Sequence, residues 1–278
     1  MSVAAIHGLI LAGGSSSRMH RDKAALQYRG KTQLDRAVEL AKRHVAQVFV
    51  SVRANQSLDQ TRAQHAMIVD SVEGEGPIVG IRSALAAHPQ AAWLVLACDL
   101  PFLSDAAVDE LLRARDSKSL ATAYTSAHDG LPEPLCAIWE PAAASLLADY
   151  QAGGGLCPRK FLVRHGAHLL APVDARALDN VNTPEEYAEA AATLEASAPM
   201  QLKIQYYALM REQAGRSEEV LETAAATPAD LYAELVARYR FTLSREQLKV
   251  AVNSEFCEWS RKLAANDAVV FIPPVAGG

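Results

Sequence analysis

The sequence contains few of the residues that tie small extracellular proteins together. Its 278 residues include four scattered cysteines, and no two of them form a C-x-x-C pair: Cys98, Cys136, Cys157 and Cys257. Neither a disulfide framework nor a zinc site of the usual spacing is therefore indicated. Scattered cysteines of this kind are typical of reduced thiols, so we expect the protein to work in the cytoplasm.

The sequence also lacks a membrane-length hydrophobic run and an excess of basic residues. Its first apolar stretch, residues 4–12, is too short to cross a bilayer, and it has neither the basic region nor the cleavage site of a secretory signal. The formal net charge is −5, whereas binders of nucleic acids and of anionic membranes select basic surfaces. We therefore expect neither nucleic acid nor membrane among the partners.

Apolar runs that alternate with amphipathic segments predict an α/β domain in the first two thirds of the chain. Strand–helix–strand units of this length form right-handed parallel crossovers, and strands that are apolar on both sides suit a sheet covered by helices on both faces. The pattern predicts a doubly wound, mostly parallel, Rossmann-like sheet, whose ligands bind beyond the carboxyl ends of the strands. The expected strands are 4–12, 48–52, 67–69, 93–97, 120–125 and 135–139, and the expected helices are 33–44, 78–87 and 106–115.

The first expected strand runs directly into a glycine loop, Leu-Ala-Gly-Gly-Ser-Ser-Ser-Arg-Met-His-Arg-Asp-Lys, which spans residues 11–23. Gly13 and Gly14 have no Cβ, so their backbone N–H groups can approach phosphate oxygens closely. Arg18 and Lys23 add full positive charge. The loop has neither the spacing of a dinucleotide fingerprint nor the Gly-Lys-Ser/Thr ending of a P-loop. It predicts an anion-binding loop of another kind.

Two acidic residues follow expected strands directly. Asp70 comes after the third strand and precedes the glycine-rich segment 74–80, and Asp99 comes after the very apolar fourth strand. At the sheet edge Asp99 can hold Mg²⁺, which needs only one or two carboxylate oxygens beside phosphate and water. An aspartate after a strand can equally be a helix cap, although Ser104 or Asp105 can cap the following helix as well.

The glycine loop resembles that of the nucleotidyltransferases, in particular the molybdenum cofactor guanylyltransferases. The match includes Leu11 to Ser15, Ser17 to Met19, and the pair Asp22-Lys23, and it fails at His20, where the family has glycine. The segments 70–80 and 98–102 match the same family in order and spacing, whereas Ser51 and Arg53 replace residues that are often asparagine there.

This resemblance implies an enzyme that transfers GMP from GTP to molybdenum-molybdopterin and releases pyrophosphate. Gly13, Gly14, Arg18 and Lys23 would hold the phosphates, and Asp99 would hold Mg²⁺. Leu11, Ala12 and Asp70 would face the nucleotide, and Asn182 would lie on the pterin side. A cytidylyltransferase or a sugar-phosphate nucleotidyltransferase with the same loop is the alternative.

Three further segments of this domain have a structural interpretation beside the functional one. Thr183 can cap a helix that begins at Pro184, with Glu186 closing a capping box, so Asn182 can belong to a cap as well as to a site. The basic residues 159–164, after Gly153-Gly154-Gly155, indicate either a lip over an anionic ligand or a solvated helix face. We interpret Cys98 as a buried apolar residue and not as a nucleophile.

A second domain is expected after the small, helix-breaking segment Ala196-Ser197-Ala198-Pro199. We place a nucleotidyltransferase domain at residues 1–196 and a smaller domain at residues 200–278. About eighty residues can fold alone with a modest core. Strands over 201–207, 249–253 and 268–272 around a helix over 228–239 predict a small α+β fold.

The sequence ends in Pro273-Pro274-Val275-Ala276-Gly277-Gly278. The prolines stiffen the segment, and the two glycines are slim enough to enter a narrow active site. With Tyr206, Tyr207, Ala208, Arg211 and Glu212, this pattern resembles the small sulfur-carrier subunit of molybdopterin synthase, a ubiquitin-like β-grasp protein.

In that family the terminal glycine, here Gly278, is adenylated and converted to a thiocarboxylate. The resemblance implies two partners, an adenylating and sulfur-transferring enzyme and the large subunit of molybdopterin synthase. A plain interaction module, or a sulfur carrier for thiamine or tRNA, is the alternative.

Overall fold

The computed structural model describes residues 4–12, 22–72, 74–172, 174–196 and 199–273. Contacts between residues divide the chain into two units, Met1–Ala191 and Ala192–Gly278, and the division falls inside helix α6 (Pro184–Ala196). We predicted that residues 1–196 and residues 200–278 form two domains. That each of them folds independently stays a prediction. None of the helices in these described ranges is both long enough and apolar enough to span a bilayer.

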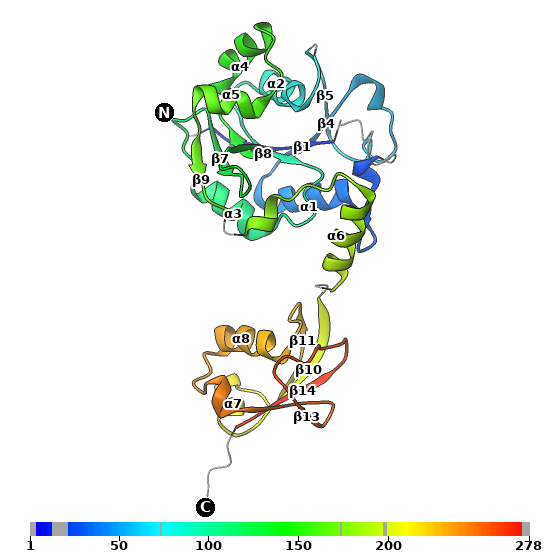
Figure 1. Cartoon of the computed structure of the whole chain (residues 1–278), viewed down its shortest axis with the longest axis vertical. Coiled ribbons are helices and arrows are strands. Elements are labelled where there is room, and N and C mark those ends of the chain that lie inside the picture. The colour runs from blue at the N-terminus through cyan, green and yellow to red at the C-terminus, as the bar shows by residue number, and fades with distance from the viewer. Residues whose placement is uncertain (1–3, 13–21, 73, 173, 197–198, 274–278) are drawn as a thin grey trace, which may run out of the picture. The chain divides into compact units, whose positions relative to one another are not determined.

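The first unit is built on a seven-stranded sheet (Figure 1). In the order in which they pair, its strands are β5 (Met67–Val69), β4 (Val48–Val52), β1 (Ile6–Leu11), β6 (Ala92–Ala97), β8 (Pro132–Trp139), β7 (Ala121–Thr125) and β9 (His168–Leu170). The pairs β5–β4, β4–β1, β1–β6 and β7–β9 are parallel, and only β8 runs against its two neighbours in this sheet. The predicted mostly parallel, doubly wound sheet is confirmed.

Helices cover both faces of this sheet. Helices α1 (Gln33–His44) and α3 (Asp105–Arg113) lie on one face, and α2 (Pro77–Ala87), α4 (Ala143–Ala152) and α5 (Pro158–His165) lie on the other (Figure 1). Each face has its own apolar core, so all six residues of β6 are buried. This double burial explains why the strand is apolar without interruption in the sequence.

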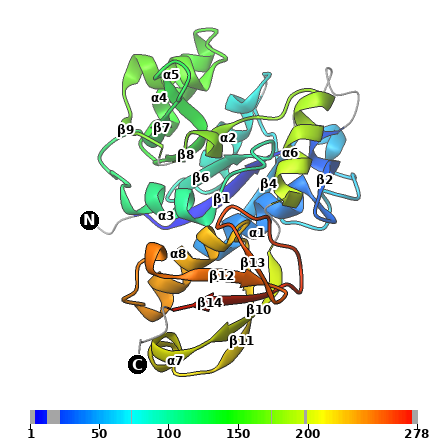
Figure 2. The same ribbon diagram turned by 60° about the horizontal axis from the view of Figure 1, so that its bottom comes forward.

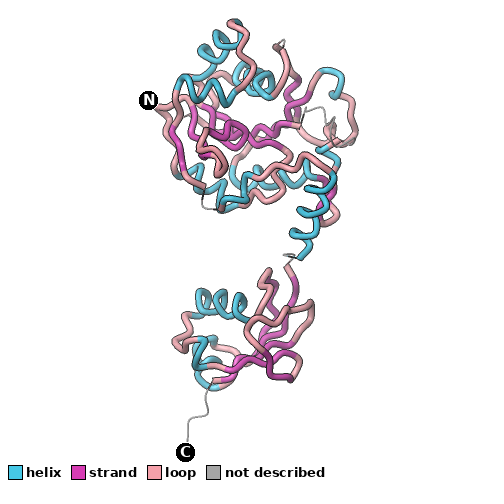
Figure 3. The backbone as a smooth tube through the Cα atoms, viewed as in Figure 1, coloured by secondary structure: helices cyan, strands magenta, loops and turns pink. Residues whose placement is uncertain are grey.

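The alternation of strands and helices along the first unit is visible in Figure 3. The predicted helix over 33–44 and the predicted strands over 48–52 and 67–69 have the bounds that the structure gives them. In this unit the prediction missed α4, β9 and the two short strands β2 (Gln27–Tyr28) and β3 (Lys31–Thr32). Residues 159–164 lie in α5, so the basic segment is helical, and its proposed contact with an anionic ligand stays a prediction.

The second unit is a five-stranded sheet that packs against one long helix. In pairing order the strands are β11 (Glu218–Thr223), β10 (Met200–Tyr206), β14 (Ala268–Ile272), β12 (Lys249–Val252) and β13 (Glu255–Cys257). The two central strands, β10 and β14, are parallel, and the outer pairings are antiparallel. Helix α8 (Pro228–Tyr239) lies across one face, as Figure 2 shows, and a short helix, α7 (Ala208–Ala214), follows β10. The predicted β-grasp arrangement is confirmed.

The core of the second unit explains why these elements form. Leu202, Ile204 and Tyr206 point from β10 to the same side as Val269 and Phe271 of β14, and Leu231 and Leu235 of α8 pack on them. Helix α8 starts at a capping box in which Thr227 accepts from Asp230 N at 3.3 Å and Asp230 Oδ2 accepts from Thr227 N at 3.0 Å. Alternation on the strands and a capped helix together define one buried layer.

Candidate functional site

Three predicted residues meet at the carboxyl edge of the first sheet. Lys23 Nζ lies 2.7 Å from Asp99 Oδ2 and 2.7 Å from Asn182 Oδ1. The Lys23 and Asp99 side chains are 20% and 19% exposed, so both reach solvent and any ligand that arrives from it. The structure therefore brings together a cation, a carboxylate and an amide from three distant parts of the sequence.

Each of the three residues is held by its own element. Lys23 begins a short 3₁₀ turn, η1 (Lys23–Ala25), which Asp22 caps by accepting from Ala24 N at 3.0 Å. Asp99 follows β6, and its backbone carbonyl accepts from Val181 N at 3.1 Å. Ser104 caps α3, so Asp99 is not a cap of that helix. This result favours the functional interpretation of Asp99.

Asn182 is held by the start of α6. Glu186 Oε2 accepts from the backbone N–H groups of Asn182 and Thr183 at 2.6 and 3.1 Å, and Thr183 Oγ1 accepts from Glu186 N at 3.2 Å. The predicted capping box is confirmed. Because the cap uses the backbone of Asn182, its side chain stays available for Lys23, and the two interpretations of this segment are compatible.

Helix α6 is tied in turn to a small hairpin, β2 (Gln27–Tyr28) and β3 (Lys31–Thr32). Tyr187 donates its hydroxyl to Gln27 O at 2.8 Å, and its ring lies 5.2 Å from that of Tyr28. This hairpin follows η1 directly, so one group of contacts fixes both Lys23 and Asn182.

The nucleotide-side residues lie along the same edge of the sheet. Asp70 follows β5, and Ser51 is in β4. Leu11 is the last residue of β1, and Ala12 is the residue after it. Ser51 Oγ donates to Asp70 Oδ1 at 3.3 Å. Burial raises the pKa of Asp70 above its ordinary value of 3.8, although the hydrogen bond from Ser51 and the charge of Arg53 oppose the shift.

Gly80 allows α2 to approach this edge closely. A Cβ at this position would lie 2.3 Å from Ser51 Oγ and 2.9 Å from Leu11 Cδ2. A glycine inside a helix costs about 0.5–1 kcal/mol relative to alanine. The close approach explains why the helix carries one here.

Gly80→Ala is therefore expected to destabilise the protein, although alanine is the better helix former. Overpacking against Ser51 and Leu11 should cost about 1–3 kcal/mol, measured by urea unfolding followed by circular dichroism. The matched control is Gly153→Ala, whose added Cβ would meet atoms no closer than 3.5 Å. Equal stability of the two variants would contradict the packing argument.

A cavity of about 200 Å³ opens where β6 ends and the antiparallel strand β8 begins. Its walls combine apolar surface from Ala97, Leu100 and Pro134 with the polar residues Asn180 and Arg159. Arg159 is paired with Glu133 at 2.6 Å and with Asp129 at 3.1 Å. Apolar walls with a few fixed polar groups are typical of a small-molecule site.

The cysteines near the edge are not reactive. Cys98 and Cys136 are buried, and burial raises the pKa of each thiol to about 12. Since the thiolate is the nucleophilic form, neither cysteine is suited to attack a substrate. The structure agrees with the interpretation of Cys98 as a packing residue.

Four of the predicted site residues, Gly13, Gly14, Arg18 and Gly278, lie outside the described residues. Their roles stay predictions.

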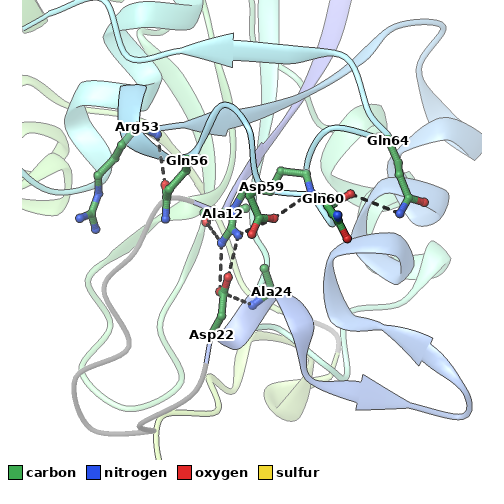
Figure 4. A network of polar contacts seen from close by, with 9 residues as sticks. Ala12, Asp22, Ala24, Arg53, Gln56, Asp59, Gln60 and Gln64 are labelled. Carbon is green, nitrogen blue, oxygen red and sulfur yellow. Dashed lines mark hydrogen bonds and ion pairs between the residues drawn. The ribbon is translucent and has the colours of Figure 1, made fainter.

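The residue that the sequence analysis missed is Arg62, which is 1% exposed and whose guanidinium lies between Ala12, Asp22 and Asp59. Figure 4 shows these three residues with dashed lines converging between them.

Asp99 is the predicted ligand of Mg²⁺ at this edge of the sheet. No group of three histidine, cysteine or acidic side chains with the geometry of a complete metal site occurs within the ranges that the structure describes. Mg²⁺ does not need such a group, because one or two carboxylate oxygens suffice beside phosphate and water. The partly exposed carboxylate of Asp99, next to the cation that would meet phosphate, matches this requirement.

Comparisons with known families match both units. The MobA-like NTP transferase domain matches residues 8–169, and the ThiS family matches residues 204–278. The first match contains the glycine loop, Asp70 and Asp99, and the second contains the β-grasp unit from the middle of β10 onward and the terminal glycines.

Individual relatives agree with these family matches. The molybdenum cofactor biosynthesis bifunctional protein of Synechocystis sp. is 34% identical over 184 residues, which are 66% of this chain and 53% of that protein, so the chain spans about half of its length. The molybdenum cofactor guanylyltransferase of Pseudomonas fluorescens is 32% identical over 179 residues, which are 64% of this chain and 89% of the relative.

A solved structure supports the fold of the first unit. It is that of molybdopterin-guanine dinucleotide biosynthesis protein A from Archaeoglobus fulgidus, with a TM-score of 0.59 and 21% identity over 68% of this chain and 98% of that one. At this identity the likeness concerns the fold alone.

Proposed function

The chain belongs to the MobA-like NTP transferase family and carries a ThiS-family domain after it, and from this premise we propose that it transfers GMP from GTP to molybdenum-molybdopterin. The observation that carries the proposal is the convergence of Lys23, Asp99 and Asn182 at the carboxyl edge of the sheet. Ligands of open α/β sheets bind at this edge.

The reaction is a displacement at phosphorus. A terminal phosphate oxygen of the acceptor forms a bond to the α-phosphorus of GTP, and the bond from that phosphorus to the bridging oxygen of pyrophosphate breaks. The attacking group is already an anion, so no general base is required. Catalysis then depends on positioning and on neutralising the charge of the leaving phosphates.

Lys23 supplies that neutralisation, together with Gly13, Gly14 and Arg18 of the glycine loop. Its ammonium is placed 2.7 Å from Asp99, so the cation and the carboxylate act at one point of the site. Asp99 would hold Mg²⁺, and the ion would supply further positive charge to offset that of the phosphates. Asn182 fixes Lys23 from the other side through its side-chain oxygen.

The nucleoside lies along the edge formed by Leu11, Ala12 and Asp70. Leu11 and Ala12 supply the backbone next to the glycine loop. Asp70, ionised, can only accept hydrogen bonds, and the Watson–Crick edge of guanine offers N–H donors to such a group. This match supports GTP over CTP.

The affinity for GTP is expected to fall as the pH is lowered. The fall should begin at a higher pH than it would if Asp70 had the ordinary pKa of an aspartate. Burial raises the pKa of Asp70, so protonation removes its acceptor at a higher pH than usual. Asp70→Asn should weaken GTP binding by about ten- to a hundredfold near neutral pH and abolish this pH dependence, as measured by titration calorimetry.

The same variant should not destabilise the protein. A raised folded-state pKa means that this group favours folding below its unfolded pKa and loses that contribution as the pH rises through its folded pKa. Near neutral pH the ionised carboxylate is therefore the costly form, and asparagine removes the charge. Asp149→Asn, on the exposed side of α4, serves as the control. An unchanged pH profile in Asp70→Asn would contradict the assignment.

The cavity at the end of β6 is the proposed place for part of the acceptor. Ala97, Leu100 and Pro134 offer apolar surface to a flat ring system, and Asn180 and Arg159 offer polar contacts to its edges. The cavity and Asp99 both lie where β6 ends, and this proximity supports the proposal that the acceptor phosphate approaches the α-phosphorus from the cavity.

The test of the proposed function is an incubation with molybdopterin and each of the four nucleoside triphosphates, scored by pyrophosphate release. We expect turnover with GTP that depends on both molybdopterin and Mg²⁺. Turnover with CTP alone would defeat the guanylyl assignment and favour a cytidylyltransferase.

The second unit is proposed to carry sulfur in the cytoplasm as a thiocarboxylate of Gly278. The ThiS match and the β-grasp sheet support a partnership with the large subunit of molybdopterin synthase. An adenylating and sulfur-transferring enzyme would activate the terminal glycine. A pull-down with the large synthase subunit separates this role from that of a thiamine or tRNA sulfur carrier.

A further inference from the structure

The guanidinium of Arg62 is buried among backbone and carboxylate oxygens. Its Nε and Nη2 atoms donate to Ala12 O at 3.1 and 2.7 Å, and Nη1 and Nη2 donate to the two carboxylate oxygens of Asp22 at 2.6 and 3.0 Å. Nη1 also lies 3.1 Å from Asp59 Oδ1. Burial alone would lower the pKa of Arg62, but the pairs with Asp22 and Asp59 raise it above its ordinary value.

Such a buried ion pair is expensive unless its geometry is nearly complete. Taking two charges out of water costs several kcal/mol each, and the pair recovers this only with well-formed hydrogen bonds. Arginine suits the task because its planar fork can bind a carboxylate with two parallel bonds and a carbonyl with the remaining donors. The cost suggests a role beyond packing.

Two of the three partners of Arg62, Ala12 and Asp22, flank the glycine loop in the sequence. Ala12 directly follows β1, and Asp22 directly precedes η1. Arg62 itself lies before β5, 50 residues after Ala12 and 40 after Asp22. One side chain therefore connects the end of the first strand with the start of the turn that carries Lys23.

Asp22 passes this constraint to Lys23. The oxygen Oδ1 that accepts from Arg62 also accepts from Ala24 N at 3.0 Å, and this bond caps η1. Lys23 is the first residue of η1, and its ammonium reaches Asp99 and Asn182. Without the two hydrogen bonds from Arg62, the Asp22 side chain would no longer be fixed. The start of η1, and with it the position of the Lys23 ammonium, would then be less well defined.

We propose that Arg62 is a positioning residue for nucleotidyl transfer, which holds Ala12 and Asp22 so that Lys23 meets the phosphates beside Asp99. The proposal rests on the NTP-transferase part of the proposed function and is independent of the base and of the acceptor. It assigns Arg62 no contact with the substrate.

The first unit offers a matched control for a purely structural role. Arg115 is also largely buried, at 10% exposure, and it pairs with both oxygens of Glu140 at 2.6 and 2.8 Å and with Ala4 O at 2.8 Å. Its partners are again one carboxylate and one backbone carbonyl, but Ala4 precedes β1, at the opposite end of the strand from the site.

The test compares Arg62→Lys, Arg115→Lys, Lys23→Ala and the double variant Arg62→Lys/Lys23→Ala in the full chain. Melting temperature, Mg-GTP and Mg-CTP affinity by calorimetry, and kcat with KM are measured for each. We expect the two arginine variants to lose similar stability, whereas only Arg62→Lys weakens nucleotide binding, by about tenfold. When Lys23 is already alanine, Arg62→Lys should weaken nucleotide binding by less than about threefold, because both changes act through the Lys23 ammonium.

Three results would overturn the proposal: equal loss of binding in Arg115→Lys, full binding in Arg62→Lys, or effects of Arg62 and Lys23 that simply multiply. Should Arg62→Lys fail to fold, Asp22→Asn, whose side chain is 38% exposed, must give the same coupling with Lys23→Ala. Binding of CTP in place of GTP would defeat the guanylyl assignment alone, and Mg-CTP then serves as the probe for Arg62. Binding of neither nucleotide by the unaltered chain would overturn both proposals.

Discussion

Replacing Lys23 by alanine is expected to lower the rate of pyrophosphate release by about a hundred- to a thousandfold, the usual cost of losing one placed electrostatic group. The ammonium is the described cation nearest to Asp99, and it is held from two sides by Asp99 Oδ2 and Asn182 Oδ1. Charge that develops on the leaving pyrophosphate would lose this partner. The measurement is kcat with GTP and molybdopterin at saturating concentrations of both.

The same change should leave the fold nearly as stable as before. The Lys23–Asp99 pair is partly exposed, and ion pairs of this kind contribute about 0–1 kcal/mol. Lys31→Ala is the matched control, since Lys31 Nζ also pairs with a carboxylate, Glu39, at 2.8 Å but is 56% exposed. Turnover above a tenth of the original rate in Lys23→Ala would remove this residue from the site.

Asp99→Asn should cause a loss of similar size, and the double variant should be little worse than either single one. Groups that act as one unit have effects that do not multiply. Independent, multiplying losses would mean that the 2.7 Å pair is incidental to the reaction.

The convergence of Lys23 and Asp99 could be predicted from the sequence because it follows from topology. An apolar run marks each buried parallel strand, and the residue after the run lies at the shared carboxyl edge whatever the details of packing. This rule places Asp70 and Asp99 at the edge, and the resemblance to the guanylyltransferases supplied their functional interpretation. Asn182 was named for another reason, the resemblance to the guanylyltransferases, whereas the capping pattern after it predicted only where α6 begins.

Arg62 could not be found in this way. A buried arginine and a solvated one look alike in a sequence, and Arg62 stands in a polar segment without period or motif. What distinguishes it is a set of contacts 40 and 50 residues away along the chain, with Asp22 and Ala12. Such contacts arise from tertiary packing, which local patterns do not encode.

The missed strands have a similar cause. Strand β9 has only three residues, two of them exposed, so it shows no alternation that a sequence pattern can detect. Strand β11 carries Glu219, whose carboxylate accepts from the hydroxyls of Tyr206 and Tyr239. Strand prediction depends on apolar residues alternating with polar ones, with the apolar residues toward the core. In β11 a charged residue takes one of these inward positions and is paired with two tyrosines, so the alternation is lost.

Removal of Gly278 is expected to abolish sulfur carriage completely and to leave GMP transfer unchanged. The proposed chemistry uses the terminal carboxylate of a glycine. That carboxylate attacks the α-phosphorus of ATP and expels pyrophosphate, and a sulfide-level sulfur nucleophile from the partner enzyme then attacks the acyl carbon and displaces AMP to give the thiocarboxylate. After truncation the terminal carboxylate lies one residue earlier in the chain. It then cannot reach the reacting position in an active site shaped for an extended diglycine. The measurement is the mass of the chain after incubation with the activating enzyme, ATP and a sulfur donor.

The Lys23→Ala variant is the natural control for this truncation. It should lose GMP transfer and keep thiocarboxylation, whereas the truncated chain should show the opposite. The expectation follows from the separate cores of the two units, since each has its own sheet and its own buried cluster. Thiocarboxylation that survives truncation would contradict the carrier role. Loss of both activities in either variant would mean that the two units depend on each other for folding or for catalysis, and the two proposed functions would then have to be treated as one.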